Sequence, residues 1–250
     1  MTAFDLHERV AVVTGASSGI GRAVALGLAE AGAHVLTWGR ADNVGSVAEE
    51  IRRRGGTAEA VLADLSDLDA AAACAQDVLA RAEVDILVNS AGIIRRGPSA
   101  TTSTAHWREV LTVDLDATWV LCREFGARML NRGTGKIINV ASMLSFQGGQ
   151  QVASYAAAKH GVVGLTKALA NEWAGGGVNV NAIAPGYVKT ANTAPLRQDA
   201  ERSAQITARI PAGRWAEPED MVGPAVFLAS DAASYVHGHV LAVDGGWLGA

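Results

Sequence analysis

Short apolar runs and longer segments with helical spacing alternate along this chain of 250 residues. The runs are rich in Val, Ile and Leu, and they predict buried strands near residues 9–14, 33–38, 57–63, 84–89, 135–142, 178–184 and 239–246. The segments between them predict helices near residues 19–31, 44–54, 67–81, 104–130 and 152–174. Continuously apolar strands separated by helices are typical of a parallel sheet that is covered on both faces. We therefore expect an α/β fold of the Rossmann type: a doubly wound, seven-stranded parallel sheet with helices on both faces.

One long excursion interrupts the alternation, near residues 186–215, between the sixth and seventh strands. In this architecture, such an insertion lies over the carboxyl edge of the sheet, where ligands bind. We expect it to form a substrate lid. The chain has no linker, repeat or low-complexity tract, so residues 1–250 are expected to form a single domain.

Charge and composition make several classes of partner improbable. The formal net charge is −4, and the longest basic run is Arg52–Arg54, so we expect no nucleic-acid partner. No stretch of eighteen apolar residues is present, so no membrane span is expected. Cys74 and Cys122 lie far apart in helical contexts and predict reduced thiols. Together with charges near the N-terminus, where a signal peptide would be apolar, this favours a cytoplasmic protein. No metal site is predicted.

The stretch "VVTGASSGIGRAV" places three glycines, Gly15, Gly19 and Gly21, between the first strand and the first helix. Glycines at this turn allow the backbone to approach a ligand closely, and the free N–H groups of the helix N-terminus attract a pyrophosphate. The strand, turn and helix around them are the context that supports this interpretation. We therefore expect a dinucleotide site here, with contacts also from Ser17, Ser18 and Ile20.

The chain that follows indicates how the far end of a dinucleotide would be held. No acid stands at the end of the second strand, where a NAD-binding protein often places one, and Arg40 follows instead. An arginine here can pair with the 2′-phosphate of NADP, but it can equally be an exposed loop residue. NAD and NADP therefore both remain open. Further cofactor contacts are expected from residues that follow the third and fourth strands, namely Asp64, Leu65, Asn89, Ala91 and Gly92.

The stretch "SMLSFQGGQQVASYAAAKHG" carries three polar side chains that suit proton transfer during alcohol oxidation. Tyr155 and Lys159 are one helical turn apart and face the same side. A free phenol has a pKa of about 10, so a nearby cation is needed to favour its ionised form at neutral pH. Ser142, at the end of the fifth strand, can hold the substrate oxygen. We expect Tyr155 to be a general acid/base, supported by Lys159 and Ser142.

With these motifs the chain resembles the short-chain dehydrogenase/reductase family over nearly its whole length. The matching stretches are "TGASSGIG", "NSAG", Ser142, "YAAAK" and "PGYVKT". The resemblance implies a single dinucleotide-binding and catalytic domain, in which Ser142 orients the substrate, Tyr155 transfers the proton and Lys159 also holds the nicotinamide ribose. It further implies cofactor contacts from Pro185, Gly186, Val188 and Thr190, with Thr190 at the carboxamide.

One position departs from the family pattern. The family usually has an active-site asparagine in the long fourth helix, and "TVDLDA" has Asp114 there. A carboxylate can accept the hydrogen bonds that an amide accepts, but it has no amide donor. Asp114 is therefore expected to join the catalytic group with an altered environment for Lys159.

Further stretches resemble one group within this family more specifically, for example "ASMLSFQGG", "NVNAIAPGYV", "RIPAGRW" and "AVDGGWL". They are similar to the group of dehydrogenases that act on sugar acids, 2-dehydro-3-deoxy-D-gluconate or 2-deoxy-D-gluconate, usually with NAD. A substrate with a carboxylate and several hydroxyls would need polar contacts. Candidates for these contacts are Arg95, Ser142, Gln147, Gln150, Tyr187, Asn192 and Arg197.

Two other functions remain open at this point. A 3-oxoacyl-carrier-protein reductase would have the same fold, although it would call for a basic docking patch, and only Arg95 and Arg96 stand near the expected mouth. A non-catalytic nucleotide-binding regulator is less compatible with the intact Ser142, Tyr155 and Lys159. The family resemblance, together with the apolar content of the fourth and fifth helices and of the C-terminus, predicts a homotetramer.

Overall fold

Seven strands form one parallel sheet in a computed structural model that describes residues 3–40 and 43–250. The strands lie in the order β3-β2-β1-β4-β5-β6-β7, and every pairing between neighbours is parallel. Their bounds are β1 Val10–Thr14, β2 His34–Gly39, β3 Thr57–Leu62, β4 Ile86–Asn89, β5 Gly135–Val140, β6 Val178–Pro185 and β7 Val240–Val243. The predicted fold class and all seven strands are therefore confirmed.

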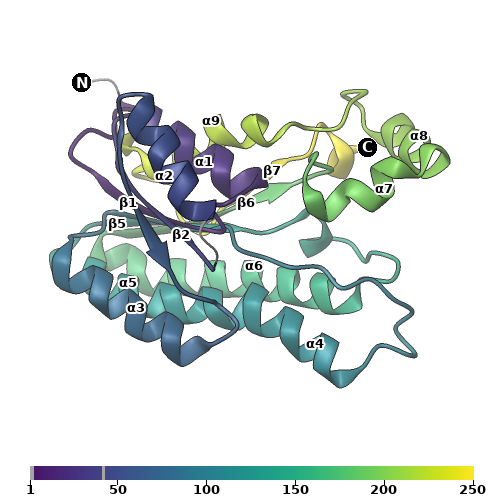
Figure 1. Cartoon of the computed structure of the whole chain (residues 1–250), viewed down its shortest axis with the longest axis horizontal. Coiled ribbons are helices and arrows are strands. Elements are labelled where there is room, and N and C mark those ends of the chain that lie inside the picture. The colour runs from purple at the N-terminus through teal and green to yellow at the C-terminus, as the bar shows by residue number, and fades with distance from the viewer. Residues whose placement is uncertain (1–2, 41–42) are drawn as a thin grey trace.

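Helices cover both faces of the sheet (Figure 1). One apolar core packs α1, α2 and α9 against one face, and a second packs α3, α5 and α6 against the other. The helix bounds are α1 Gly19–Glu30, α2 Asn43–Arg53, α3 Leu68–Arg81, α4 Thr104–Leu111, α5 Ala117–Arg132, α6 Ala153–Trp173, α7 Ala194–Gln198, α8 Ala200–Arg209 and α9 Val222–Ala229. The sheet is apolar on both sides because each of the strands β1 to β6 contributes to both cores. For example, Val13 lies in the first core and Val12 in the second.

Three parts of the helical structure differ from the sequence expectation: the segment near 104–130, the excursion near 186–215, which contains the unpredicted helices α7 and α8, and α9. The segment expected as one helix near 104–130 is divided by a π-helical turn, Thr112–Asp116, between α4 and α5. Such turns insert one extra residue into the helical ladder and are often found at functional sites. Helix α9 was not predicted, because Gly223 and Pro224 look like turn residues. Pro224 is tolerated because it lies in the first turn of the helix, where no intrahelical N–H bond is lost.

The strand order explains where a ligand can bind. After β3 the chain crosses back and adds β4 on the other side of β1, so the loops that follow β1 and β4 leave the sheet in opposite directions. This divergence opens a crevice at the carboxyl edge. The connection after β6 crosses the same edge through α7 and α8 before the chain returns in β7. Within the described residues, no helix combines the length and apolar character that crossing a bilayer requires.

Candidate active site

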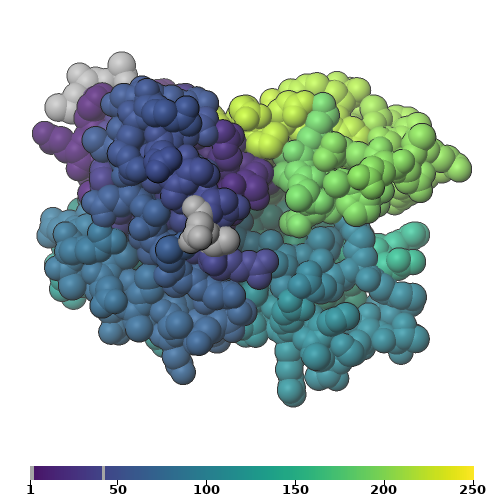
Figure 2. Space-filling model, in the orientation of Figure 1, coloured from purple at the N-terminus to yellow at the C-terminus, as the bar shows by residue number. Residues whose placement is uncertain are grey.

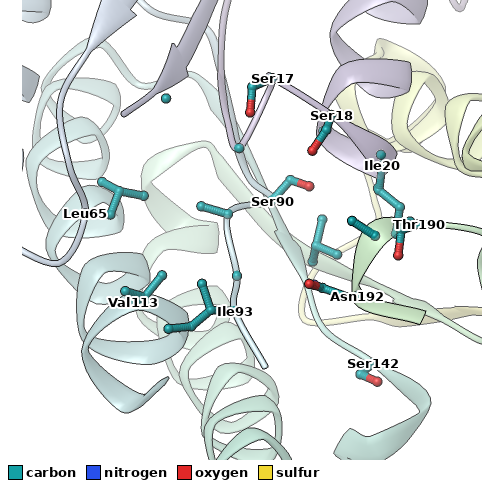
Figure 3. A pocket seen from close by; sticks show the side chains of 18 of the residues that line it. Ser17, Ser18, Ile20, Leu65, Ser90, Ile93, Val113, Ser142, Thr190 and Asn192 are labelled. Carbon is teal, nitrogen blue, oxygen red and sulfur yellow. The ribbon is translucent and has the colours of Figure 1, made fainter. Parts of the chain in front are cut away.

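A cleft of about 380 Å³ lies at the carboxyl edge of the sheet. In the space-filling view, the green segment around residues 190–210 stands beside the purple and blue N-terminal half, with a hollow between them (Figure 2). Figure 3 shows side chains from several loops around this cleft, with Ser17 and Ser142 toward opposite ends of the view. The predicted site residues that line it are Gly15, Ser17, Ser18, Gly19, Ile20, Gly21, Arg40, Asp64, Leu65, Ala91, Gly92, Ser142, Tyr155, Lys159, Pro185, Gly186, Val188, Thr190 and Asn192.

The glycine-rich turn after β1 is built from positions that exclude side chains. Gly15 has a φ of +66°, and a Cβ there would lie 2.8 Å from the Cα of Ala91. At Gly21 a Cβ would lie 2.3 Å from the carbonyl oxygen of Gly15. The turn thus folds tightly over the first residues of α1, whose N–H groups have no partners within the helix. The result is a backbone cradle of the kind that binds phosphate.

The hydroxyl of Thr14 fixes the loop after β4 against this turn. Its oxygen accepts hydrogen bonds from the backbone N–H groups of Ser90 at 3.0 Å and Ala91 at 3.1 Å. Thr14 is buried at the end of β1, so two strands that are distant in sequence are tied together at the floor of the cleft. The sequence analysis did not single out Thr14, because a threonine in a strand is usually only a β-branched packing residue.

Arg40 and Asp64 line the cleft from the loops that follow β2 and β3. In the strand order these loops lie on one side of β1, and Tyr155 on α6 follows β5 on the other side. Both side chains are exposed and both line the cleft. Asp64 accepts a hydrogen bond from the backbone N–H of Ser66, at 2.9 Å. This bond, and to a smaller extent the charge of Arg40, holds the pKa of Asp64 below its usual value. Arg40 is therefore the cation that reaches this end, and no carboxylate from β2 accompanies it there.

Tyr155 and Lys159 come together from successive turns of α6. The ammonium nitrogen of Lys159 lies 5.6 Å from the centroid of the Tyr155 ring. Lys159 is buried, and its ammonium donates a hydrogen bond of 2.9 Å to the carbonyl oxygen of Val140, at the end of β5. Ser142 follows two residues later, and its hydroxyl accepts a hydrogen bond from the backbone N–H of Leu144 at 3.1 Å. Three groups suited to proton transfer thus converge at the cleft wall.

The pKa of Tyr155 is raised above its ordinary value in this structure. Burial is the largest cause, since it disfavours the phenolate. The positive charge of Lys159 opposes this effect, and a hydrogen bond with Ser142 and the charge of Arg96 act in the same direction as Lys159. We expected one ammonium to lower the pKa of Tyr155 substantially. The direction of its influence agrees with that expectation, but the desolvation of the phenol outweighs it here.

Comparisons with known proteins identify the family to which this chain belongs. A family model described as enoyl-(acyl carrier protein) reductase matches residues 15–248. The 2-dehydro-3-deoxy-D-gluconate 5-dehydrogenase of Pseudoalteromonas atlantica is 51% identical over 249 residues, which are 98% of this chain and 98% of that protein. The chain belongs to the short-chain dehydrogenase/reductase family.

Solved structures agree with this family. A protein of Beutenbergia cavernae, assigned as an NAD(P)-dependent gluconate 5-dehydrogenase and carrying NADP at low occupancy, is 69% identical with a TM-score of 0.99. A protein of Agrobacterium tumefaciens, assigned as a 2-deoxy-D-gluconate 3-dehydrogenase with bound NADP, is 52% identical with a TM-score of 0.95. Both comparisons cover 100% of each chain. The protein is thus a short-chain dehydrogenase/reductase that uses NAD or NADP and acts on CH–OH groups.

The cleft of this short-chain dehydrogenase/reductase fits such a dinucleotide. It runs from Arg40 and Asp64, past the glycine cradle, to Tyr155 and Lys159. Gly15 and Gly21 show that the cradle has no room for a side chain, so a phosphate can approach the backbone. Thr190 lies beside the cradle, since a Cβ on Gly19 would be 3.2 Å from its methyl group. These residues would hold the cofactor between them.

Asp114 lies beneath the cleft wall rather than in it. It is fully buried in the π-helical turn between α4 and α5. Its Oδ1 accepts a hydrogen bond of 2.8 Å from the backbone N–H of Ile93, and its Oδ2 lies 3.7 Å from the ammonium of Lys159. Burial raises the pKa of Asp114, while Lys159 and the Ile93 N–H oppose this effect. Asp114 therefore contacts Lys159 from beneath the cleft wall and does not itself reach the cleft.

Asn89 was expected to contact the cofactor, but the structure places it below the cleft. Its amide donates a 2.9 Å hydrogen bond to Asn139 on β5, whose amide in turn donates to Thr166 on α6 at 2.9 Å. All three side chains are buried. In place of Asn89, the neighbouring Ser90 lines the cleft. Asn89 thus joins β4 to β5 and α6 in a buried polar network under the site.

Most of the expected substrate contacts are engaged elsewhere. Arg95 donates two hydrogen bonds to the carboxylate of Glu109, and Gln147 accepts one of 2.9 Å from the indole of Trp247. Arg197 donates to the carbonyl oxygen of Thr190 at 3.2 Å, and Gln150 is exposed away from the cleft lining. Of the seven candidates, only Ser142 and Asn192 line the cleft.

Tyr187 packs in the segment after β6 and does not line the cleft. Its ring lies edge-on to Trp215 and Trp247, with centroid distances of 5.1 and 4.9 Å. Trp215 and Trp247 belong to a small apolar cluster of the buried residues Met143, Ile206, Ile210, Trp215 and Trp247. We call it the lid cluster, because Ile206, Ile210 and Trp215 belong to the segment expected to form a lid, and it is separate from the two cores that flank the sheet.

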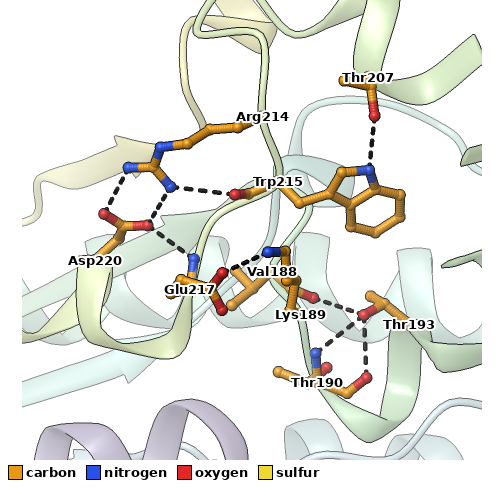
Figure 4. A network of polar contacts seen from close by, with 9 residues as sticks. All are labelled: Val188, Lys189, Thr190, Thr193, Thr207, Arg214, Trp215, Glu217 and Asp220. Atoms are coloured by element: carbon orange, nitrogen blue, oxygen red, sulfur yellow. Dashed lines mark hydrogen bonds and ion pairs between the residues drawn. The ribbon is translucent and has the colours of Figure 1, made fainter. Parts of the chain in front are cut away.

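Polar contacts fix both ends of the excursion over the cleft (Figure 4). The hydroxyl of Thr193 donates to the carbonyl oxygen of Val188 at 2.6 Å and accepts from the backbone N–H of Thr190 at 3.1 Å. At the other end, Arg214 forms a bidentate pair with Asp220, at 2.7 and 2.8 Å. These bonds fix the backbone locally at each end of the segment, and at the first end they hold the turn that carries Thr190.

The cleft also has lining residues that the sequence analysis did not name. They are Trp38, Gly39, Ala63, Ser66, Ser90, Ile93, Glu109, Val113, Val140, Ala141, Ala191 and Thr193. Several directly neighbour named residues at strand ends, so the rule that ligands bind at the carboxyl edge could have found them. Glu109 and Val113 carry no such signal, because they reach the cleft from α4 and the π-helical turn.

Proposed function

We propose that this short-chain dehydrogenase/reductase interconverts an alcohol and a ketone on a sugar acid, such as 2-dehydro-3-deoxy-D-gluconate or 2-deoxy-D-gluconate. The observation that carries the proposal is the meeting of Tyr155 and Lys159 in one cleft, with a second basic group, Arg96, bonded to the lining residue Asn192 and close enough for its charge to act on Tyr155. The names of the relatives in Pseudoalteromonas atlantica and Agrobacterium tumefaciens point to the same class of substrate.

The proposed chemistry divides between the cofactor and the chain. The nicotinamide, when bound, accepts the hydride from the carbinol carbon during oxidation and returns it during reduction. Ser142 holds the substrate oxygen through its hydroxyl. The phenolate oxygen of Tyr155 takes the hydroxyl proton as the C–O bond becomes a carbonyl, and Lys159 stabilises the phenolate by its charge. Tyr155 returns that proton in the opposite direction.

The proposed cofactor contacts follow the cleft from end to end. Gly15, Gly19 and Gly21, with Ser17, Ser18 and Ile20, would hold the pyrophosphate on the N-terminus of α1. Asp64 and Leu65 would contact the adenine, and Ala91 and Gly92 would let the ribose lie close to the backbone. Lys159 would also hold the nicotinamide ribose. The carboxamide would meet Thr190, with Pro185, Gly186 and Val188 beneath it.

Arg40 gives NADP a partner for its 2′-phosphate in this proposal. Arg40→Ala is expected to raise the Kd for NADP about tenfold or more and to leave the Kd for NAD nearly unchanged. The reason is that a charge-assisted pair contributes about 1.5–3 kcal/mol, reduced by water at this exposed end. Titration of both cofactors against both proteins measures the effect. An unchanged Kd for NADP would mean that Arg40 is a solvated loop residue, and a wild-type protein that already binds NAD more tightly than NADP would show that NAD is the preferred cofactor.

Arg96 is our candidate for binding the substrate carboxylate. Arg95 already holds Glu109, whereas the guanidinium of Arg96 makes one bond of 3.3 Å to the carbonyl oxygen of Asn192, which lines the cleft. Arg96 also lies near enough to Tyr155 and Tyr187 for its charge to lower the pKa of each phenol.

Substituting the two arginines separately tests this function. Arg96→Ala is expected to lower kcat/KM for a sugar acid by about tenfold or more, because it removes a charge-assisted bond to the carboxylate. The matched control, Arg95→Ala, is expected to have a smaller effect. Sugar acids and uncharged polyols should be assayed in parallel, with both cofactors. Equal losses for acids and polyols, or turnover of polyols alone, would argue against a sugar-acid substrate.

The remaining parts of the proposal concern assembly and the lid. We propose that residues 186–215 act as a substrate lid on a single-domain protomer, that four copies form a homotetramer, and that the enzyme works in the cytoplasm. Sedimentation as a monomer at micromolar concentration would contradict the tetramer. The 3-oxoacyl-carrier-protein reductase and the non-catalytic regulator are not favoured, since the most similar relatives named above are sugar-acid dehydrogenases.

A further inference from the structure

A buried ion pair lies behind the tyrosine of the site. The carboxylate of Asp114 is 0% exposed and the side chain of Lys159 is 5% exposed, and 3.7 Å separates Oδ2 from the ammonium nitrogen. Tyr155 is one helical turn from the same lysine. The ammonium therefore stands between a phenol that must ionise and a carboxylate that competes for the same positive charge.

The surroundings of Asp114 leave this carboxylate few other partners. Its Oδ1 is held by the backbone N–H of Ile93, but its Oδ2 is buried and has no hydrogen-bond partner among the described residues. Gly92 lies against both charges, since a Cβ there would be 3.1 Å from Oδ2 and 3.5 Å from the ammonium of Lys159. A buried carboxylate oxygen without a donor depends on the nearby cation for its stabilisation.

We propose that Asp114 is a positioning residue that acts through Lys159. Its carboxylate partly neutralises the positive charge of the lysine and so sets the pH range in which Tyr155 accepts a proton. This inference rests on the proposed role of Tyr155 as the acid/base. It concerns the tuning of that group and does not depend on which alcohol is the substrate.

The sign of the effect follows from the charges around the phenol. Lys159 from α6 and Arg96 from the loop after β4 favour the phenolate, as does the hydroxyl of Ser142 after β5. Asp114 from the π-helical turn is the one negative group among these neighbours, and it raises the pKa of Tyr155. The carbonyl of Val140 keeps the lysine in place at 2.9 Å. Removing the carboxylate charge therefore leaves the ammonium free to favour the phenolate more strongly.

Asp114→Asn tests the proposal with the full chain and without any substrate. The chain has three tyrosines, so the phenolate absorbance of wild type minus that of Tyr155→Phe isolates the titration of Tyr155. We expect the same difference taken in the Asp114→Asn background to show a midpoint lower by about one pH unit, from one unit charge removed within the site. Asparagine keeps the oxygen that accepts from Ile93, so the local fold is retained. The pH profile of oxidation should move in the same direction.

Two further variants separate charge from packing. Asp114→Ser removes the same charge from a shorter side chain and should also lower the midpoint. Asp116→Asn removes a charge from the same π-helical turn at a position that is not buried against Lys159, and should leave the midpoint unchanged. Circular dichroism at each pH checks that the proteins are folded. An unchanged or raised midpoint in both folded Asp114 variants overturns the proposal. A lowered midpoint in an enzyme that turns over no sugar acid would overturn only the proposed substrate.

Discussion

Tyr155→Phe is expected to lower kcat by about 10²–10⁴-fold, because the variant keeps the ring and loses the oxygen that transfers the proton. The ring packs beside Lys159 in either case, so the Kd of the dinucleotide should change little. Steady-state rates in both reaction directions, together with a cofactor titration, measure the two quantities separately. Loss of rate in both directions is expected, since the same oxygen takes the proton in one and returns it in the other.

The matched control for this substitution is Tyr187→Phe. Tyr187 also loses a hydroxyl, but its ring is held between Trp215 and Trp247 outside the cleft lining. It should retain most of the wild-type rate. If Tyr155→Phe keeps more than about a tenth of the wild-type rate, acid/base catalysis by Tyr155 is ruled out as the main source of acceleration.

Gly21→Ala is expected to weaken cofactor binding by about tenfold to a hundredfold. The added Cβ would lie 2.3 Å from the carbonyl oxygen of Gly15, so the turn that cradles the phosphates must move. Overpacking of this kind costs about 1–3 kcal/mol, and here the displaced atoms are the backbone of the binding site itself. Equilibrium titration with NADPH, followed by the fluorescence of its dihydronicotinamide ring, measures the loss.

Gly164→Ala is the control for the cradle variant. Gly164 lies within α6, as Gly21 lies within α1, but a Cβ there meets nothing within 4 Å. Its substitution should leave the cofactor Kd unchanged and stabilise the fold by about 0.5–1 kcal/mol, because alanine favours the helix. Equal Kd values for wild type and Gly21→Ala would mean that the dinucleotide does not bind on this turn.

The sheet and the place of the site were predictable because both depend on local patterns. Val10–Thr14 and Val178–Pro185 are apolar enough to be recognised as buried strands without knowledge of their neighbours. Once the strands are parallel, all the loops at their carboxyl ends must meet at one edge. The helical spacing of Tyr155 and Lys159 then places two polar groups on one side of α6. These inferences need no side-chain packing.

The features that escaped prediction depend on contacts between distant residues. The π-helical turn at Thr112–Asp116 has no sequence signal of its own. Asn89 resembles a cofactor contact by its position after β4, but its amide is used by Asn139, fifty residues later in the chain. Arg95 and Arg96 are equivalent in sequence, and only the position of Glu109 on α4 tells them apart.

In the proposed role of residues 186–215 as a substrate lid, the lid cluster would govern how the cleft opens. Met143, Ile206, Ile210, Trp215 and Trp247 are buried together, apart from the cores that hold α1 and α6 against the sheet. Moving α7 and α8 would therefore disturb this small cluster and leave the main cores packed. Under the proposed lid role, access of substrate and unfolding of the chain would depend on different sets of contacts. A change in the rate of opening need not alter global stability, so the speed of product release can evolve independently of the strength of the fold.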